Sequence, residues 1–241
     1  MAERRTSAAP GALDYFPTPP WSARAGGELI RRIDPLARTC WEPACGEGHM
    51  AWGLADYFDQ VWASDIHDHG DPFGVFRALG QTVGRADFLD ERATEAPAGR
   101  PDWIVTNPPF VSGEAFVRRA LPIARRGVAM LLRSVFLEGA GRYPLFTDPQ
   151  LGFAVAAQFA ERVPMVKGRW DPQASSATAY SWFVWVKPDV SLLSLLGDVE
   201  PGAHLGLIIP PGTRARLSRR EDLARFCTDE GELFGGGVAN R

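Results

Sequence analysis

The feature that most constrains the fold is a recurring order of short apolar run, loop and helical segment. The expected strands lie at 39–41, 60–64, near 83, 102–106 and 127–132, and the expected helices between them at 49–58 and 112–126. Strands that alternate with helices form a parallel sheet with helices on both faces. We therefore expect an α/β fold built on a mostly parallel sheet.

The flanking segments follow other patterns. Pro19 and Pro20 suit the start of a helix, which we expect to run through about Arg32. Later in the chain, residues 159–166 and 179–187 resemble two adjacent strands joined by a polar loop, and 205–209 form one more short strand. The Gly-rich C-terminal end, TDEGELFGGGVANR, is expected to fray.

The composition narrows the class of protein. With 241 residues, 45% hydrophobic and 23% charged, the chain can bury a sizeable core in one large domain. No apolar run approaches the roughly 18 residues of a membrane-spanning helix, and the N-terminus lacks the apolar stretch of a secretory signal. The three cysteines form no CxxC pair, which favours a reducing cytoplasm without structural zinc. The net charge of −3 excludes a wholly basic nucleic-acid binder but permits a local basic stripe.

A glycine-containing turn, EPACGEG, connects the first expected strand to the helix after it. Gly46 and Gly48 would let the backbone turn tightly and approach a ligand near helix N–H groups. About twenty residues later, Asp65 ends the next strand, where an acid is well placed for the two hydroxyls of a ribose. The turn is neither GxGxxG nor a P-loop, so a nucleoside-containing ligand is favoured over a pyrophosphate.

A stiff turn, Asn107-Pro108-Pro109-Phe110, follows the apolar run Trp103-Ile104-Val105. Neither proline can donate to a strand ladder, and each fixes its own φ, so the strand must end here. The turn therefore holds Asn107 and Phe110 in fixed positions at the end of a strand.

Together these segments resemble the S-adenosylmethionine-dependent methyltransferases of the amino-methylating type. In that resemblance EPACGEG corresponds to the glycine-rich motif, Asp65 to the ribose-binding acid, and Asp87-Phe88 to the pair that holds the adenine. NPPF corresponds to the catalytic (Asp/Asn/Ser)-Pro-Pro-(Tyr/Phe/Trp) motif, and FPTPPW at 16–21 to a segment that closes over the methionine end. The likeness spans about residues 15 to 190 and is greatest to short phage and prophage enzymes that methylate DNA adenine.

The resemblance implies a Rossmann-like class I methyltransferase fold, with a mostly parallel seven-stranded sheet and a C-terminal antiparallel strand pair. It divides the chain into a flexible lead (1–14), a single methyltransferase domain (15–210) and a partly disordered tail (211–241). The implied cofactor is S-adenosyl-L-methionine. Its expected binding residues are Thr18, Pro19, Glu42, Pro43, Ala44, Cys45, Gly46, Gly48, Asp65, Ile66, Asp87, Phe88 and Asn107.

The catalytic residues that the resemblance implies, Asn107, Pro108, Pro109 and Phe110, suit the methylation of a conjugated amine. Such an amine is a weak nucleophile because its lone pair is delocalised. If the Asn107 side-chain oxygen and the Pro108 carbonyl both accept from the NH₂ group, the nitrogen is drawn towards a tetrahedral shape. Phe110 can stack on the planar target, and the released proton goes to water.

The expected partner is nucleic acid, most naturally DNA, with recognition segments within 134–178. The candidate contact residues in this region are Lys167, Arg169, Trp170, Ser175, Ser176 and Thr178, which interleave cations, an aromatic ring and hydroxyls. A solvated connection between strands is an equally good interpretation of the same loop. Arginines at 118, 119, 125 and 126, and in RARLSRR at 214–220, are more simply explained as solvated helix faces.

Two other segments contain residue types found in metal or catalytic sites, but their spacing supports neither kind of site. The DIHDHGD segment at 65–71 is dense in metal-ligating types but has no third ligand at a familiar spacing, so no metal is expected. Cys45 as a nucleophile would need His49 as its base, and a small residue that fits the turn is the better interpretation.

Three functions remain open on the sequence. The first is site-specific methylation of adenine N6 in DNA. The second is N-methylation of another planar amine, in an RNA base or a protein glutamine amide. The third is a cofactor-binding module without catalysis. A sizeable recognition domain, common in sequence-specific DNA methyltransferases, has no room here beyond 134–178 and the residues after 188.

Overall fold

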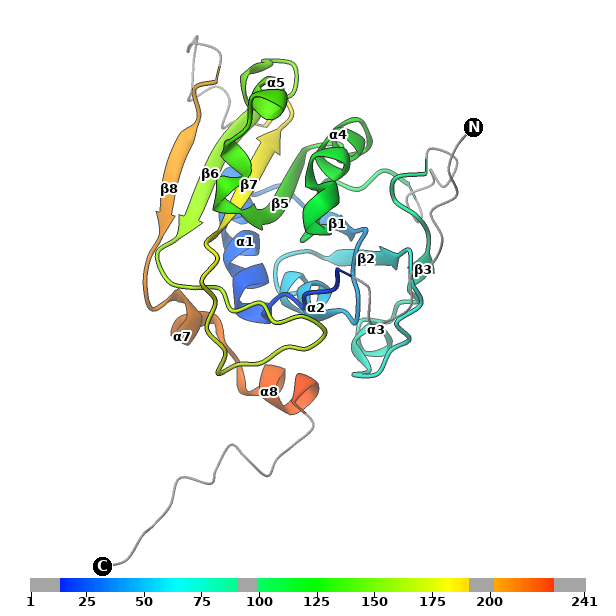
Figure 1. Ribbon diagram of the computed structural model, residues 1–241. Coiled ribbons are helices and arrows are strands. Elements are labelled where there is room, and N and C mark those ends of the chain that lie inside the picture. The colour runs from blue at the N-terminus through cyan, green and yellow to red at the C-terminus, as the bar shows by residue number, and fades with distance from the viewer. Residues whose placement is uncertain (1–13, 91–98, 191–201, 228–241) are drawn as a thin grey trace, which may run out of the picture.

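The computed structural model describes residues 14–90, 99–190 and 202–227. Its centre is one eight-stranded sheet with the order β3-β2-β1-β4-β5-β7-β6-β8 (Figure 1). The strands are β1 (Thr39–Glu42), β2 (Gln60–Asp65), β3 (Gly84–Arg85), β4 (Trp103–Thr106), β5 (Gly127–Arg133), β6 (Phe153–Phe159), β7 (Tyr180–Val186) and β8 (Leu205–Ile209).

The sheet is parallel except at β7. The neighbours β3, β2, β1, β4 and β5 pair in parallel, β7 pairs antiparallel with both β5 and β6, and β8 pairs in parallel with β6. The expected parallel sheet with an antiparallel pair is therefore confirmed. It has one strand more than the expected seven, because 205–209 pairs with β6 as an added edge strand.

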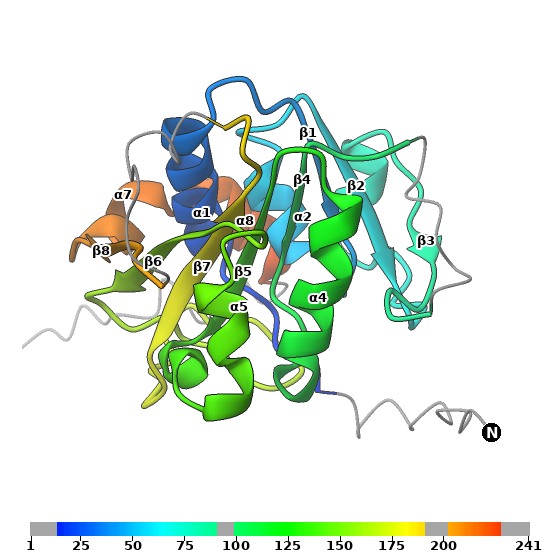
Figure 2. The same cartoon turned by 90° about the horizontal axis from the view of Figure 1, so that it is seen from above.

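Helices cover both faces of the sheet (Figure 2). On one face lie α1 (Pro20–Ile33), α2 (His49–Leu54), α7 (Thr213–Leu217) and α8 (Arg220–Phe226), and on the other α4 (Gly113–Ile123) and α5 (Tyr143–Thr147). The remaining short helix, α3 (Val75–Ala78), lies between β2 and β3 in the chain, and 3₁₀ turns occupy Phe110–Ser112, Ser134–Leu137 and Ala140–Arg142.

Alternation along the strands separates the core into two layers. In β4, the side chains of Trp103 and Val105 pack with α1 and α2, whereas Ile104 packs with α4. In β7, Trp182 and Val184 lie on the first side and Phe183 on the second. Since successive strand residues point to opposite faces, a run that is apolar at every position serves both layers.

The sequence analysis misplaced one strand. The strand expected at 159–166 lies at Phe153–Phe159, and its partner, expected at 179–187, is β7. Pro164 cannot donate to a ladder. The apolar residues Val163 and Met165 on either side of it are buried from a loop rather than from a strand.

The C-terminal helices α7 and α8 are docked on α1 by Arg24, which donates to the Leu217 carbonyl of α7 at 3.0 Å and forms a buried ion pair with α8. Arg24 of α1 donates to both carboxylate oxygens of Asp222 in α8, at 2.6 and 2.8 Å, and to Asp56 at 2.6 Å. Trp52 of α2 also donates its indole N–H to Asp222, at 3.1 Å. Arg24 and Asp222 are 1% and 2% exposed, so α8 holds α1 and α2 together through charges that water does not screen.

The expectations of a flexible lead and a fraying end fall almost entirely outside the described residues, at 1–13 and 228–241. Within the described residues, no helix is both long and apolar enough to cross a membrane.

The buried ion pair leads to a stability prediction. Asp222→Ala should lower the free energy of unfolding by about 3–5 kcal/mol, because it leaves the Arg24 charge buried with less compensation. The matched control is Glu28→Ala, which removes an acid that pairs with Arg216 from the exposed side of α1 and should cost less than about 1 kcal/mol. Urea denaturation of both variants measures the difference. Equal costs would contradict the structural role given to Asp222.

Candidate active site

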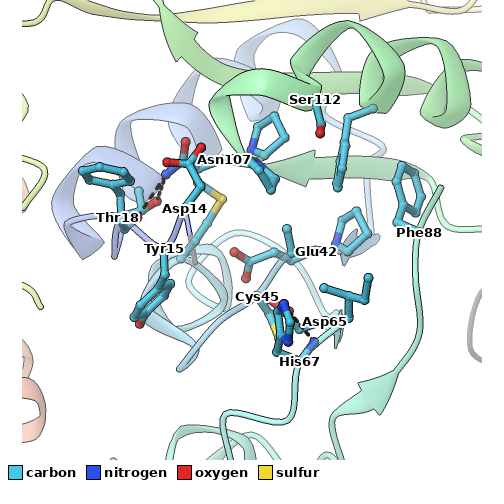
Figure 3. A pocket seen from close by; sticks show the side chains of 18 of the residues that line it. Asp14, Tyr15, Thr18, Glu42, Cys45, Asp65, His67, Phe88, Asn107 and Ser112 are labelled. Carbon is cyan, nitrogen blue, oxygen red and sulfur yellow. Dashed lines mark hydrogen bonds between the residues drawn. The ribbon is translucent and has the colours of Figure 1, made fainter. Parts of the chain in front are cut away.

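A pocket opens where β1, β2 and β4 end. Parallel neighbours place their carboxyl ends at the same edge, so residues from separate strands meet there. The pocket is lined by Asp14, Tyr15, Phe16, Pro17, Thr18, Glu42, Pro43, Ala44, Cys45, His49, Met50, Asp65, Ile66, His67, His69, Asp87, Phe88, Leu89, Asn107, Pro108, Pro109, Phe110, Ser112 and Phe116. Figure 3 shows the side chains of most of them around one cavity.

The structure brings most of the sequence-predicted cofactor residues to this one pocket. Three of them lie beside it rather than on its wall. Pro19 begins α1, where its carbonyl accepts from the backbone N–H of Ser22 at 2.9 Å. Gly46 and Gly48 shape the turn whose other residues form the wall.

Both glycines of the turn are required by geometry. Gly46 has φ of +51° and Gly48 has φ of +90°, in the region that L side chains rarely adopt. A Cβ on Gly46 would lie 2.4 Å from the Tyr15 ring, and one on Gly48 would lie 2.8 Å from Val75. The turn thus combines a left-handed backbone with close packing on both sides.

Asp65 ties the ends of β1 and β2 together at the pocket. Its carboxylate accepts from the backbone N–H groups of Gly46 and His67, both at 2.9 Å, and lies 3.7 Å from the His69 ring. Burial raises the pKa of the Asp65 carboxyl, but His69 and the two N–H groups outweigh burial and hold the pKa below its ordinary value. Interaction with Asp65 raises the pKa of His69. Asp65 is therefore a fixed, ionised acceptor on the pocket wall.

Glu42, at the end of β1, is a different kind of acid. It is 2% exposed, and its Oε2 has no hydrogen-bond partner among the described residues. Burial and the neighbouring Asp65 charge raise the pKa of its carboxyl well above the ordinary value. A buried carboxyl with a free oxygen in a pocket is suited to a cationic ligand group, which would favour the ionised form.

An apolar wall lies on the other side of Asp65. Phe88 is 4% exposed. Its ring packs edge-on against Trp41 at 5.3 Å and is tilted against Phe116 at 5.0 Å. Asp87 accepts the backbone N–H of Leu89 at 2.9 Å, and Ile66 exposes 42% of its surface at the pocket. Such a wall suits the flat face of an aromatic ligand.

Asn107 follows the end of β4, and three acceptors determine how its amide is turned. Its Nδ2 donates to the Thr18 hydroxyl at 3.0 Å (Figure 3). It also donates to the Phe16 carbonyl at 3.2 Å and, more weakly, to the Met165 sulfur at 3.7 Å. Its Oδ1 has no hydrogen-bond partner among the described residues. Because the Phe16 carbonyl and the Met165 sulfur can only accept, they fix the NH₂ end of the amide on their side. The oxygen is left as an unused acceptor in the pocket wall.

Phe110 ends the motif and is surrounded by aromatic and charged groups. Its ring lies 4.9 Å from Phe16 and 6.0 Å from Tyr180, and the Arg133 guanidinium lies over it at 4.2 Å from the centroid. Its backbone N–H donates to Asp14 at 2.9 Å. Phe110 is therefore held by the N-terminal segment, through Asp14 and Phe16, and by Arg133 at the end of β5.

Several residues of the pocket were missed in the sequence analysis. Tyr15 covers Gly46, donates its hydroxyl to Glu47 at 2.9 Å and lies 5.0 Å from the His69 ring. His67 donates its backbone N–H to Asp65, and the His69 ring lies 3.7 Å from the Asp65 carboxylate. The DIHDHGD composition was a signal for His69, whereas Tyr15 had no signal beyond its position before FPTPPW.

Cys45 and His49 do not form a nucleophile–base pair. The Cys45 thiol contacts its neighbour's carbonyl at 3.6 Å, and burial, with Glu42, raises its pKa far above the ordinary value. Burial lowers the pKa of His49 to about 3, and its ring stacks on Phe226 of α8 at 4.1 Å. Both side chains are neutral packing groups. The described residues include no metal-binding cluster of three His, Cys, Asp or Glu.

The predicted nucleic-acid residues do not line the pocket. Lys167, Arg169 and Ser175 are exposed, and Ser176 and Thr178 are half-buried. Trp170 packs edge-on against Phe226 at 5.9 Å and lies 6.3 Å from the His49 ring, so it contributes to the core. The loop at 160–179 is joined to the pocket by the hydrogen bond from Gly168 N–H to the Tyr15 carbonyl at 2.9 Å, and its Met165 sulfur accepts weakly from Asn107 at 3.7 Å.

Most of the arginines that had been weighed as phosphate contacts are occupied within the protein. Arg118 pairs with Glu114, Arg125 with Asp102, and Arg126 with Asp34. Arg119 donates to the Phe88 carbonyl, Arg216 pairs with Glu28, and Arg219 pairs with Asp56.

The sequence matches no family model and no curated protein. Solved structures of similar fold include the methyltransferase subunit of a type I restriction-modification system from Streptococcus thermophilus. It has a TM-score of 0.56 and 14% identity, over 72% of this chain and 45% of that one. A modification subunit of a proposed type I restriction enzyme from Vibrio vulnificus has a TM-score of 0.53 and 13% identity, over 89% and 52%.

This chain therefore spans about half the length of those two structures. At such low identity the likeness concerns the fold alone. The Rossmann-like methyltransferase fold expected from the sequence is confirmed.

The crowded turn leads to a second stability prediction. Gly48→Ala should lower the free energy of unfolding by about 2–5 kcal/mol, through left-handed backbone strain and overpacking against Val75. Gly70→Ala is the matched control, since Gly70 has φ of +65° and nothing within 4 Å of an added Cβ. It should cost only about 1–2 kcal/mol. If chemical denaturation gives the same loss for both, close packing at the turn is not the constraint.

The Asp65–His69 pair predicts a pH dependence of stability. A raised folded-state pKa makes His69 stabilising below its unfolded pKa of about 6.5, and this contribution is lost as the pH rises through the raised value. His69→Gln should therefore be less stable than the parent at about pH 5.5, and the difference should fade towards about pH 9. Thermal melts across this range measure it. A difference that does not change with pH would contradict an ionic role for His69.

Proposed function

We propose that this chain is an S-adenosylmethionine-dependent N-methyltransferase whose target is the exocyclic N6 amine of adenine in DNA. The observation that carries the proposal is the state of Asn107. Its NH₂ group is fully engaged by Phe16, Thr18 and Met165, and its oxygen is free. An acceptor fixed in this way is suited to a ligand that presents an N–H donor.

The chemistry of Asn107 follows from this orientation. An amine attached to an aromatic ring can donate one hydrogen to Asn107 Oδ1 and another to the Pro108 carbonyl. Two acceptors on one nitrogen favour a tetrahedral geometry, which localises the lone pair. The two prolines hold the acceptors rigidly, so little reorganisation is needed when the target binds. The proton that the methylated nitrogen loses passes to water.

The residues of the pocket fit the proposed cofactor. The unpartnered Glu42 oxygen suits the ammonium of an amino-acid group, Asp65 suits ribose hydroxyls, and Phe88 suits the adenine face. When bound, S-adenosylmethionine would supply an electrophilic methyl group on a sulfonium centre. The turn of Pro43, Ala44 and Cys45 would form the floor beneath it.

DNA is the preferred target for two reasons. The two solved structures of similar fold are described as subunits of restriction-modification enzymes. Lys167 and Arg169 in the loop at 160–179 and Arg133 at the end of β5 are exposed cations. A base in duplex DNA must leave the stack to reach Asn107, at a cost of a few kcal/mol, which is about what stacking on Phe110 can offset.

The proposal is tested with Asn107→Ala. Tritiated methyl transfer from S-adenosylmethionine to unmethylated DNA should fall by about 100- to 1,000-fold, because one preorganised acceptor is lost. Cofactor affinity, measured by calorimetry, should stay within a few-fold of the parent. Digestion of the product of the parent protein should give N6-methyladenine.

Parallel reactions with RNA and with protein extract separate the alternatives. If tritium is incorporated only into RNA or only into protein, the chain is a methyltransferase but DNA is not its substrate. Cofactor binding without transfer to any of the three would favour a non-catalytic module. Equal activity of Asn107→Ala and the parent would overturn the assigned role of the amide.

A further inference from the structure

We propose that Arg133 is a specificity-determining residue that selects a phosphate-bearing target, by leaving the Phe110 ring when the target stacks there and pairing with a phosphate of the target strand. The inference rests on the proposed function, since it concerns how the same pocket recognises a nucleotide. It adds a residue at the mouth of the pocket to those that line it.

The position of Arg133 follows from the register of the sheet. It is the last residue of β5, and β5 pairs in parallel with β4 up to Thr106 opposite Met130. Arg133 therefore ends its strand beside the NPPF turn that follows β4. Its side chain is exposed, and its guanidinium lies 4.2 Å from the centroid of the Phe110 ring.

The charge on Arg133 is not neutralised within the described part of the chain. None of the ion pairs among the described residues includes it. Its cross-strand partner Tyr180 is buried, and burial raises the pKa of that phenol despite the opposing effect of Arg133, so Tyr180 stays neutral. Asp14, the acid beside Phe110, accepts the Phe110 backbone N–H instead.

The place that Arg133 occupies is the place a planar target needs. A guanidinium is flat and delocalised, and it stacks on an aromatic face much as a base does. Arg133 lies over one face of the Phe110 ring, and the Phe16 ring is tilted against it at 4.9 Å. A planar group that stacks on the face that Arg133 covers must displace the guanidinium. Target binding is therefore an exchange of one stacked group for another.

The exchange is favourable only for a target that brings a negative charge. Releasing Arg133 gives up its cation–π contact with the Phe110 ring. A phosphate next to the stacked base offers a bidentate, charge-assisted partner. A glutamine amide on a neutral peptide loop offers none, so the same residue disfavours that class of substrate.

The experiment measures how salt affects binding. Arg133→Ala, Arg133→Lys and the parent are titrated, with cofactor present, against a fluorescent adenine-containing DNA duplex from about 50 to 300 mM NaCl. Loss of one phosphate contact should reduce the slope of log K against log salt by about 0.9. Arg133→Lys should keep the slope, since it keeps the charge. In kinetics, Arg133→Ala should raise KM for DNA about tenfold and change kcat much less.

The control is Arg38→Ala, which removes an exposed cation that precedes β1, at the sheet edge opposite the pocket. Its slope should equal that of the parent. Cofactor affinity of all variants should be unchanged, which shows that they fold.

Different results would contradict the proposed function and the inference about Arg133. If the parent transfers methyl groups to DNA but Arg133→Ala keeps the parent's slope and KM, the inference about Arg133 is wrong and the function stands. If Arg133→Ala binds DNA more tightly than the parent, Arg133 is only an obstacle on Phe110, which also overturns it. If the parent neither binds nor methylates nucleic acid, the proposed function fails first and the inference with it.

Discussion

The whole site depends on parallel pairing among β2, β1, β4 and β5. These strands end at the same edge, so Glu42 and Asp65, the last residues of β1 and β2, and Asn107, the first residue after β4, line one pocket. Antiparallel order would place Glu42 and Asn107 at opposite edges. The parallel order is maintained because β4 and β5 are apolar at nearly every position and are buried on both faces, between α1 and α2 on one side and α4 on the other.

The parts of the fold that were predictable are those encoded locally. Runs such as WIVT and GVAMLL are apolar at every position and are stopped by proline or glycine, so their extent can be read from the sequence. The extent of the strand at 153–159 could not be predicted from the sequence. RVPMV is as apolar as FAVAAQF, and only pairing with β7 distinguishes the two. Helix α8 was missed for a related reason. Its position depends on Arg24, 198 residues away in sequence from Asp222.

The candidate site divides in the same way. The turn at 42–48, Asp65 and NPPF carry their own signals in spacing and backbone chemistry, and the structure brings them to one pocket. Tyr15 and the roles of His67 and His69 are contacts made in three dimensions, with no local pattern. Trp170 shows the opposite difficulty. Its position between the cations at 167 and 169 and the hydroxyl residues at 175, 176 and 178 suggested a nucleic-acid surface. Its indole is instead packed against the rings of His49 and Phe226.

The segment at 14–18 contacts both the NPPF turn and the loop at 160–179. Asp14 holds the backbone of Phe110, Phe16 and Thr18 hold the amide of Asn107, and the Tyr15 carbonyl holds the loop at Gly168. Residues 14–18 therefore both line the pocket and orient the Asn107 amide. Moving this segment away from the pocket would also remove two of the acceptors that orient the Asn107 amide. Access to the pocket and the orientation of Asn107 are therefore coupled through the same five residues.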